Sequence, residues 1–287
     1  MISCVITICD KDYRNIYSIV NSIHNSVKSD YEILVMDNRD KYKNIKLTNC
    51  DAHIIDMGGN MYEFESRKKS ITYAKGEYIW FIDGDDKVID SVIPDDETAD
   101  LICFNYKLSN NGGVSHFYNE EKSITENLFT LETFESIGNP VWAKLIKKDL
   151  LKKIYSQLNE VHRINIMEDA TLLFLILYYS KKIQFKTETC YEYNLGTSVI
   201  EKNSYTDIQV LESLFTGCRL PIDIINSIIP LELQESSRLK TSDLWRNNLF
   251  FMKEVYQKTS DDIKEIYYHE IVRKYYSEEE IMEIGGF

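Results

Sequence analysis

Short apolar runs alternate with amphipathic segments over the first hundred residues, and this alternation restricts the chain to few folds. Strands are predicted at Cys4–Ile8, Tyr31–Met36, His53–Ile55 and Glu77–Ile82. Helices are predicted at Asp12–Ser26 and at Met61–Ala74, the second of which Gly76 stops. Strands and helices in alternation indicate an α/β fold with a parallel, doubly wound sheet.

The rest of the chain divides at about residue 205. Before it, the pattern predicts strands at Asp100–Tyr106 and Lys182–Tyr193, helices at Lys148–Leu158 and Asp169–Ser180, and a polar hairpin around Asn111-Gly112-Gly113. Beyond it, long amphipathic patterns with many charges predict helices. We therefore expect one domain over residues 1–204 and a helical region over residues 205–287.

Two of the predicted strands run directly into acidic residues. Asp37 follows the strand that ends at Met36, and Asp83 follows the strand that ends at Ile82. Open α/β sheets bind their ligands at the carboxyl ends of the strands. The two acids therefore lie where a functional crevice is expected.

The segment Asp83-Gly84-Asp85-Asp86 is the most informative in the sequence. Three carboxylates within four residues repel one another unless a cation lies among them. Oxygen ligands on a tight turn suit Mg²⁺ or Mn²⁺, which also bind substrate phosphates, and Gly84 allows a sharp turn. By itself the segment is equally compatible with a metal site and with a solvated acidic turn.

Charge and cysteine content narrow the classes of function. The formal net charge of −13 argues against nonspecific binding of nucleic acid, which is itself a polyanion. The six cysteines are scattered without a CxxC pair, which favours reduced thiols in the core over disulfides or zinc. Since a strand-like run from Ile2 to Cys9 takes the place of a signal sequence and no apolar run can span a bilayer, we expect a cytoplasmic protein, with peripheral membrane contact left open.

A longer pattern surrounds the acidic turn. The sequence reads Ser66-Arg67-Lys68, then Ala74-Lys75-Gly76-Glu77-Tyr78-Ile79-Trp80-Phe81-Ile82-Asp83-Gly84-Asp85-Asp86. It resembles the family 2 glycosyltransferases, whose pattern is Ala-Arg-Asn, a short helix, Ala-x-Gly-Glu-Tyr-Ile and Phe-Leu-Asp-x-Asp-Asp. The segments Val5–Asp10 and Tyr31–Asn38 are similar to the first two strands of that family. The resemblance implies a GT-A fold, which is Rossmann-like, and transfer of a sugar with inversion.

The resemblance also implies roles for residues of the amino-terminal half. Thr7, Cys9 and Asp37 would contact the base or the ribose of a nucleotide, and Arg67 would help to hold that nucleotide. Asp83 would face the ribose or a metal ion. In the same pattern Asp85 would ligate the metal, which would be Mn²⁺ or Mg²⁺. The alternative readings are an ordinary turn acid for Asp37, a solvated helix residue for Arg67, and core or strand-end residues for Thr7 and Cys9.

Two downstream segments agree with the same family. Asn139–Lys147 resembles its Trp-Asn-Lys-Leu-Tyr segment, so Trp142 would lie near the sugar, although a buried core indole is the alternative. Glu168-Asp169 resembles the acidic pair at the start of a helix, where Asp169 would be the catalytic base and Glu168 would position the acceptor. Acids are also common at helix amino termini for electrostatic reasons alone.

The sequence departs from the family pattern at four positions. Thr7 replaces Pro, Lys68 replaces Asn, Ser70 replaces Gly and Ala143 replaces Asn, which puts the detailed donor contacts in question. The resemblance extends from about Ser3 to Asn194 and does not reach the carboxyl-terminal helices. It implies a nucleotide-binding half over about residues 1–106 and an acceptor half over about residues 107–204.

The predicted function is therefore metal-dependent transfer of a sugar from a nucleotide diphosphate sugar, by default a UDP-sugar. The acceptor would be a hydroxyl of a glycan or a lipid-linked saccharide, as in capsule, lipo-oligosaccharide or other surface glycan synthesis. The carboxyl-terminal helices would cover the acceptor, contact a membrane or form a homodimer.

Three alternatives remain at this stage. A phosphatase of the haloacid dehalogenase type also uses Asp-x-Asp with magnesium, but on its first strand. A nucleotidyltransferase is disfavoured because the amino terminus has no glycine-rich phosphate loop. A homologue that binds nucleotide-sugar without catalysis is the third.

Overall fold

The computed structural model describes fifteen ranges of the chain. These are residues 1–44, 46–48, 50–59, 63–90, 92, 94, 96–109, 114–116, 118–138, 140–158, 168–194, 222–241, 253–266, 272–273 and 277–283. The chain forms two compact units. The first comprises Met1–His162 and Leu172–Thr197, and the second comprises Arg163–Thr171 and Ser198–Phe287. The predicted hairpin residues Asn111-Gly112-Gly113 lie outside the described residues.

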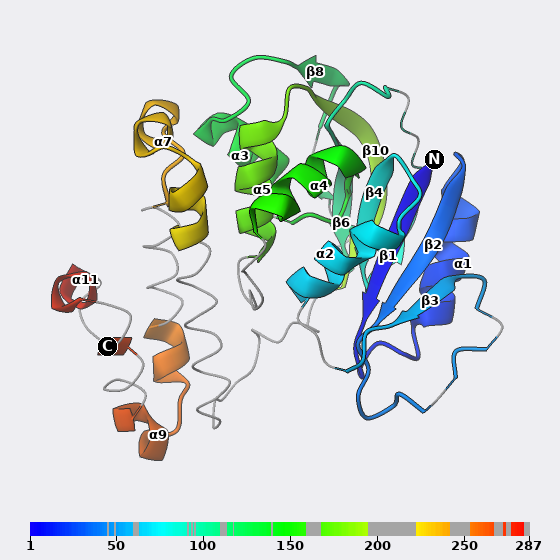
Figure 1. Cartoon of the computed structure of the whole chain (residues 1–287), viewed down its shortest axis with the longest axis horizontal. Coiled ribbons are helices and arrows are strands. Elements are labelled where there is room, and N and C mark those ends of the chain that lie inside the picture. Colours follow the sequence, from blue (N-terminus) through cyan, green and yellow to red (C-terminus); the bar gives the residue numbers. More distant parts are fainter. Residues whose placement is uncertain are drawn as a thin grey trace. The chain divides into compact units, whose positions relative to one another are not determined.

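A single sheet of ten strands forms the centre of the first unit (Figure 1). Its strands are β1 (Ile2–Ile8), β2 (Tyr31–Asp37), β3 (His53–Asp56), β4 (Tyr78–Asp83), β5 (Lys87–Val88), β6 (Leu101–Leu108), β7 (Val114–His116), β8 (Lys122–Ile124), β9 (Lys144–Lys147) and β10 (Ile183–Tyr193). The order across the sheet is β3-β2-β1-β4-β9-β6-β10-β5, with β7 paired to β6 and β8 paired to β10.

The half of the sheet that carries the acidic residues is parallel. β1 lies between β2 and β4 and is parallel to both, and β2 is parallel to β3. The antiparallel strand β9 then joins β4 to β6, which is parallel to β10. The α/β architecture predicted from the sequence is confirmed, and the predicted strands agree with the observed ones to within one or two residues. The sheet is mixed and not parallel throughout as predicted, because the antiparallel strand β9 joins its two parallel parts.

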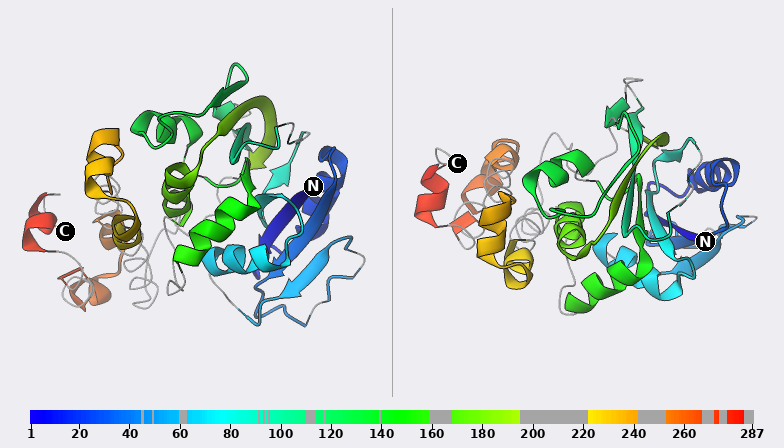
Figure 2. Two further views of the ribbon diagram at one scale, coloured as in Figure 1. Left: turned by 45° about the horizontal axis from the view of Figure 1, so that its top comes forward. Right: turned by 90° about the horizontal axis from the view of Figure 1, so that it is seen from above.

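Helices cover both faces of the sheet (Figure 2). They are α1 (Ile16–Ser26), α2 (Glu63–Tyr73), α3 (Leu131–Ile137), α4 (Lys148–Gln157) and α5 (Glu168–Tyr179). The buried isoleucines of α1 form one core cluster with Ile2, Cys4, Ile6 and Ile8, which alternate along β1 and so share a face. Phe81 stands between the cluster members Trp80 and Ile82 on β4, so its side chain lies on the opposite face of the sheet. The guanidinium of Arg67 on α2 lies 5.5 Å from the ring centre of Phe81, so α2 covers that face.

Helix α1 begins later than the sequence predicts. The prediction starts the helix at Asp12, whereas the structure has turns over residues 10–15 and helix from Ile16. Asp12 closes the preceding turn instead, because its carboxylate accepts the backbone N–H of Cys9 at 2.9 Å. The segment between β1 and α1 is therefore a structured loop and not the first turn of the helix.

The described parts of residues 205–287 contain helices, as predicted. The second unit includes α7 (Leu231–Ser237), α9 (Asp261–Ile266) and α11 (Glu278–Glu283), and residues 222–228 are also helical. Among the helices that the structure describes, none combines the length and apolar character needed to cross a bilayer. The domain boundary near residue 205 stays a prediction.

Gly76 provides a test of the packing between the α2–β4 turn and β1. A methyl group at this position would lie 2.5 Å from the backbone nitrogen of Ser3 and 2.8 Å from the carbonyl carbon of Ile2. We expect Gly76→Ala to lower the free energy of unfolding by about 1–3 kcal/mol, because backbone rather than a movable side chain fills the space. Urea unfolding measures the change, with Lys75→Ala as the exposed control; equal stability of both variants would contradict the packing.

Candidate functional site

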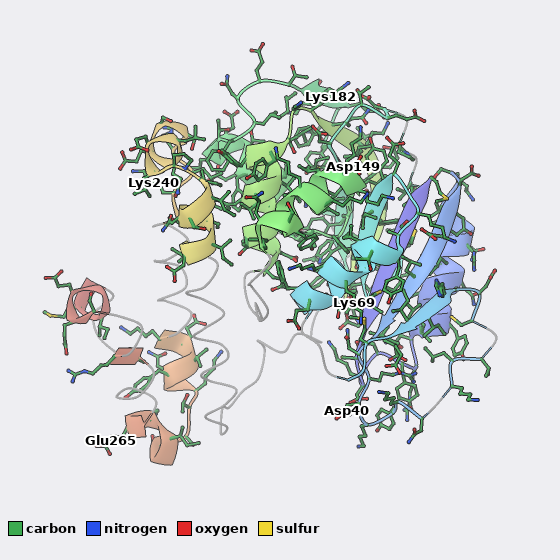
Figure 3. All side chains as sticks on the ribbon, in the orientation of Figure 1. Asp40, Lys69, Asp149, Lys182, Lys240 and Glu265 are labelled. Carbon is green, nitrogen blue, oxygen red and sulfur yellow. The ribbon has the colours of Figure 1, made fainter. Side chains whose placement is uncertain are left out.

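The register of the parallel strands brings the predicted acids to one edge of the sheet. Thr7 pairs with Asp83 across β1 and β4, and Ile8 pairs with Asp37 across β1 and β2. In Figure 3 the labelled Asp40 marks the loop that follows β2 at this edge. Because the strands are parallel, Thr7, Asp37 and Asp83 all lie at the carboxyl edge that the sequence predicts.

Arg67 is buried beneath the acidic turn. Its side chain, on α2, donates to Asp83 Oδ1 at 3.0 Å and to Glu63 Oε1 at 2.7 Å, and its exposed fraction is 2%. A buried guanidinium needs carboxylate partners, and these two acids supply them. The reading of Arg67 as a solvated helix residue is therefore wrong. Arg67 fixes the position of Asp83, and its contact with a nucleotide stays a prediction.

Asp85 forms an ion pair with a lysine that the sequence did not single out. Lys11 Nζ lies 2.8 Å from Asp85 Oδ2, across 74 positions of sequence. The side chain of Lys11 is 46% exposed and that of Asp85 is 14% exposed. The ammonium group therefore offsets part of the negative charge of the turn from its solvent side.

Asp86 lies inward and is held by hydrogen bonds from β10. Tyr191 Oη donates to Asp86 Oδ2 at 2.7 Å, and the backbone N–H of Asn194 donates to Oδ1 at 2.7 Å. Burial, with smaller contributions from Asp85 and Glu63, raises the pKa of Asp86 to about 7, although both hydrogen bonds act in the opposite direction. Tyr191 Oη also accepts the backbone N–H of Asp83 at 3.1 Å, so one tyrosine holds both ends of the turn.

The loop after β1 packs directly on the acidic turn. A methyl group on Gly84 would lie 2.7 Å from the carbonyl oxygen of Thr7 and 2.9 Å from Cβ of Asp12. The structure thus explains Gly84 by close approach of the backbone, and not by an unusual φ angle. Cys9 Sγ donates to Asp12 Oδ2 at 2.9 Å, and burial together with Asp12 raises the pKa of the thiol to about 12. Cys9 is therefore a neutral thiol that supports this loop.

The same loop is tied to the one that follows β2. The carboxylate of Asp10 accepts the backbone N–H groups of Asp40, Lys41 and Tyr42 at 3.0–3.2 Å. These three bonds, together with the backbone bond from Asn38 to the carbonyl of Ile8 at 3.0 Å, join the two loops at the carboxyl edge. The edge is therefore rigidly built before any ligand binds.

Asp37 is engaged by its own neighbour. Arg39 donates from Nε to Asp37 Oδ1 at 2.8 Å and from Nη2 to Oδ2 at 2.7 Å, and both side chains are largely buried. Such a two-point ion pair fixes the carboxylate in one orientation. Asp37 is thus more than a solvated turn acid, whereas its contact with a nucleoside stays a prediction.

Trp142 belongs to an aromatic cluster next to the turn. Its ring stacks on Tyr191 at 4.7 Å and on Tyr193 at 5.0 Å, and it meets Tyr106 edge-on at 4.6 Å. The indole is 6% exposed, which is the core position given above as the alternative. Through Tyr191, Trp142 supports the partner of Asp86. Direct stacking of Trp142 on a sugar stays a prediction.

Glu168 and Asp169 form the first turn of α5, as predicted. Both side chains are partly exposed. They fall in the stretch Arg163–Thr171, which belongs to the second compact unit, whereas the acidic turn belongs to the first. The predicted roles of base and acceptor-positioning residue therefore stay predictions.

The acidic turn fits a divalent cation that takes most of its ligands from a substrate. In the described part of the chain no cluster of three His, Cys, Asp or Glu side chains could hold a metal by itself. Lys11 occupies only Oδ2 of Asp85, and no hydrogen bond to Oδ1 is found within the described residues. Mg²⁺ commonly binds one or two carboxylates and completes its shell with phosphates and water. Asp85, with Asp83 beside it, meets this requirement.

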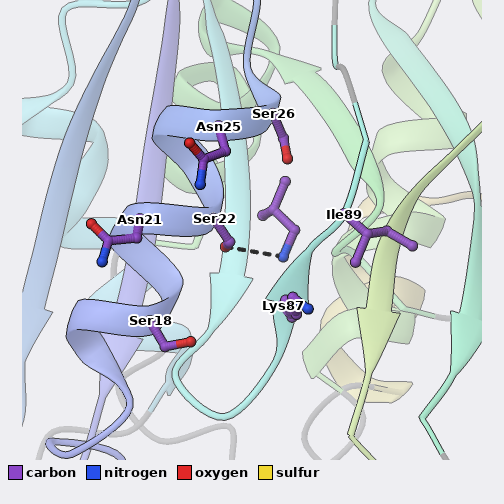
Figure 4. A pocket seen from close by; sticks show the side chains of 8 residues that line it. Ser18, Asn21, Ser22, Asn25, Ser26, Lys87 and Ile89 are labelled. Atoms are coloured by element: carbon purple, nitrogen blue, oxygen red, sulfur yellow. Dashed lines mark hydrogen bonds between the residues drawn. The ribbon is translucent and has the colours of Figure 1, made fainter.

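A polar pocket lies elsewhere on the first unit, between α1 and β5 (Figure 4). It has a volume of about 400 Å³ and is lined by Ser18, Asn21, Ser22, Asn25, Ser26, Lys87, Val88 and Ile89. Ser22 Oγ accepts the backbone N–H of Val88 at 3.3 Å, which satisfies a donor on the edge strand β5. None of the predicted site residues lines this pocket, and the bond between Val88 and Ser22 joins β5 to α1 beside it.

Sequence reasoning missed the residues that hold the acids in place. Five residues that no local motif marks bond to the predicted acids or to their loops. They are Lys11, Asp12, Arg39, Tyr191 and Asn194. One signal was present, because a turn with three carboxylates needs cations and donors from other segments. The identity of those segments depends on the fold.

The pKa of Asp86 predicts how stability changes with pH. A folded-state pKa of about 7, above the value of 3.8 for a free carboxyl, contributes stability that is complete below about pH 4 and is lost as the pH rises toward 7. We expect the stability advantage of the wild type over Asp86→Asn to shrink across this window. Urea unfolding from pH 4 to 7.5 in chelator-treated buffer measures it, with Asp149→Asn on α4 as an exposed control. A constant difference between wild type and Asp86→Asn would contradict the assignment.

Comparisons with known proteins agree with this geometry. Residues 3–96 match the family described as Glycosyl transferase family 2. No curated protein sequence matches the chain significantly. The structure of S. aureus TarS 1–349 is similar over 100% of this chain and 92% of that one, with a TM-score of 0.55 and 15% identity.

Two ligand-bound structures of the same TarS fragment are also similar over 100% of this chain and 92% of theirs. The complex with UDP has a TM-score of 0.57 at 15% identity, and the complex with UDP-GlcNAc has 0.54 at 16%. At such identities the likeness shows the shared fold alone. The family match over residues 3–96 and the GT-A fold shared with TarS make the amino-terminal part of the chain similar to the family 2 glycosyltransferases.

Proposed function

We propose that this chain is a metal-dependent, inverting glycosyltransferase that moves a hexose-type sugar from a UDP-sugar to a hydroxyl group. The observation that carries the proposal is the turn Asp83–Asp86 at the carboxyl end of β4, where Asp85 keeps one carboxylate oxygen without a hydrogen-bond partner among the described residues. The family match supports the class of reaction. The TarS complexes with UDP and with UDP-GlcNAc, which share this fold, support UDP as the nucleotide.

The residues of the turn would divide the work of donor binding. A divalent cation held by Asp85 and Asp83, Mn²⁺ or Mg²⁺, would neutralise the negative charge that develops on the departing diphosphate. Arg67 holds Asp83 from below, so the carboxylate needs no reorientation when the donor binds. Thr7, Cys9 and Asp37, at the ends of β1 and β2, would border the nucleoside.

Asp169 would take the proton of the acceptor hydroxyl. A hydroxyl is a weak nucleophile until a base removes its proton during the attack, and a carboxylate can do this. Attack from the face opposite the leaving group inverts the anomeric carbon and requires no covalent intermediate. Glu168 would orient the acceptor, which we assign to a glycan or a lipid-linked saccharide of surface glycan synthesis. We assign the enzyme to the cytoplasm, where it would meet such an acceptor at the inner face of the membrane.

Donor recognition can be tested without knowing the acceptor. We expect UDP with Mn²⁺ to raise the melting temperature of the protein, because a ligand that binds the folded state stabilises it by mass action. The rise should be smaller when the metal is chelated, and ADP, GDP and CDP serve as comparison ligands. A melting temperature that no nucleoside diphosphate changes, with or without metal, would remove the proposed donor class.

The two acidic motifs predict different defects when they are neutralised. Asp85→Asn should weaken metal-dependent binding of UDP, whereas Asp169→Asn should bind UDP normally and lose transfer by about 10²–10⁴-fold, as expected for removal of a general base. Calorimetry with UDP and Mn²⁺ gives the first quantity, and release of UDP from a UDP-sugar in the presence of acceptors gives the second. Asp149→Asn is the control for a lost exposed carboxylate. Wild-type transfer by both site variants would overturn the assigned roles.

A further inference from the structure

Lys11 differs in kind from the other cation at the acidic turn. Arg67 is 2% exposed and bonds to Glu63 and Asp83, so it cannot leave without exposing buried charge. Lys11 reaches Asp85 from the solvent side, with 46% of its side chain exposed. An exposed ion pair of this kind is weak and exchanges readily. Of these two cations, Lys11 is the one that can change partners.

The backbone that carries Lys11 is fixed although its side chain is not. Asp12, on one side of it, accepts the N–H and the thiol of Cys9, and Asp10, on the other side, accepts three backbone N–H groups of the loop after β2. Asp12 also packs on Gly84. The Lys11 backbone is therefore held at a constant distance from the acidic turn, and only its side chain needs to move.

Electrostatics near Lys11 favours an exchange when a polyanion arrives. The carboxylates of Asp85 and Asp12 both act on the Lys11 ammonium group. Asp12 is 4% exposed, and its Oδ1 has no hydrogen-bond partner within the described part of the chain. A divalent cation at Asp85 would repel the ammonium group and take its place. The oxygens of a diphosphate would then offer Lys11 a new partner of higher charge.

We propose that Lys11 is a donor-binding residue that pairs with Asp85 in the free enzyme and transfers to the diphosphate of the donor when metal and nucleotide bind. The inference rests on the proposed function and extends it to a residue outside the motifs. It makes Lys11 a competitor of the metal before the donor binds and a ligand of the donor afterwards. Removing its charge should therefore change metal affinity and nucleotide affinity in opposite directions.

The test uses the 287-residue chain with Lys11→Met and Lys11→Arg, and with Lys28→Met as the control. Lys28 is an exposed lysine of the same unit, and among the described residues its Nζ bonds only to the carbonyl of Asn25, so the control loses the same charge. Calorimetry measures Mn²⁺ alone and UDP with saturating Mn²⁺. Ligand-observed NMR measures uridine, which has no phosphate.

For Lys11→Met we expect Mn²⁺ alone to bind about threefold more tightly, the range of an exposed ion pair. UDP should bind about tenfold more weakly, because a charge-assisted hydrogen bond is lost. Uridine should bind as it does to the wild type, Lys11→Arg should recover most of the UDP affinity, and Lys28→Met should match the wild type throughout.

Each other outcome identifies what fails. If the wild type binds UDP and Lys11→Met binds it equally well, the assignment of Lys11 is wrong while the proposed donor stands. If Lys11→Met loses UDP and uridine to the same extent, the loop has been disturbed and a diphosphate contact is excluded. If the wild type itself does not bind UDP with Mn²⁺, the proposed donor falls, and this inference falls with it.

Discussion

The structure of the site depends on how four neighbouring carboxylates are kept close together. Asp12, Asp83, Asp85 and Asp86 gather where β1 and β4 end, and their mutual repulsion would open the edge of the sheet if nothing opposed it. The fold supplies a different partner for three of them. Asp83 is held by Arg67 from below, Asp85 by Lys11 from solvent, and Asp86 by donors from β10. The fourth, Asp12, uses one oxygen for its own loop.

These partners also differ in how firmly they hold. The bonds to Asp83 and Asp86 are largely buried and involve parts of the core, so they persist as long as the domain is folded. The bond between Lys11 and Asp85 is at the surface. The turn therefore has a rigid base and one exchangeable contact, which is the arrangement that a site for a charged ligand requires. The aromatic cluster of Trp142, Tyr191 and Tyr193 extends the rigid base toward the carboxyl half of the sheet.

The two acidic motifs lie in different units of the chain. The turn at the end of β4 belongs to the unit that matches the glycosyltransferase family over residues 3–96, whereas Glu168 and Asp169 belong with the carboxyl-terminal residues. The first motif can be judged from its own contacts. The second rests on its place at the start of α5 and on the order of motifs along the chain. This division is the reason why donor binding and transfer are best measured separately.

The sequence by itself determined the elements and the chemistry of the edge. Short continuous apolar runs located β1, β2 and β4 to within two residues, because strands in the middle of a parallel sheet are buried on both faces. Gly76 marked the end of α2 in the same way. The acids Asp37 and Asp83 could be placed at the carboxyl edge because parallel strands end together. The start of α1 was misplaced, since Asp12 uses its carboxylate to close a turn and not to begin a helix.

Only the tertiary structure decided which residues neutralise and support those acids. Lys11 is 74 positions from Asp85, and Asn194 is 108 positions from Asp86, so neither pair leaves a local pattern. Trp142 shows the same limit of local sequence, because a tryptophan beside a predicted site can pack against a ligand or in the core. The stacking of Trp142 on Tyr191 shows that it lies in the core. Local sequence shows which residues are apolar and which are charged, whereas the partners of the acids depend on distances that are set only when the sheet forms.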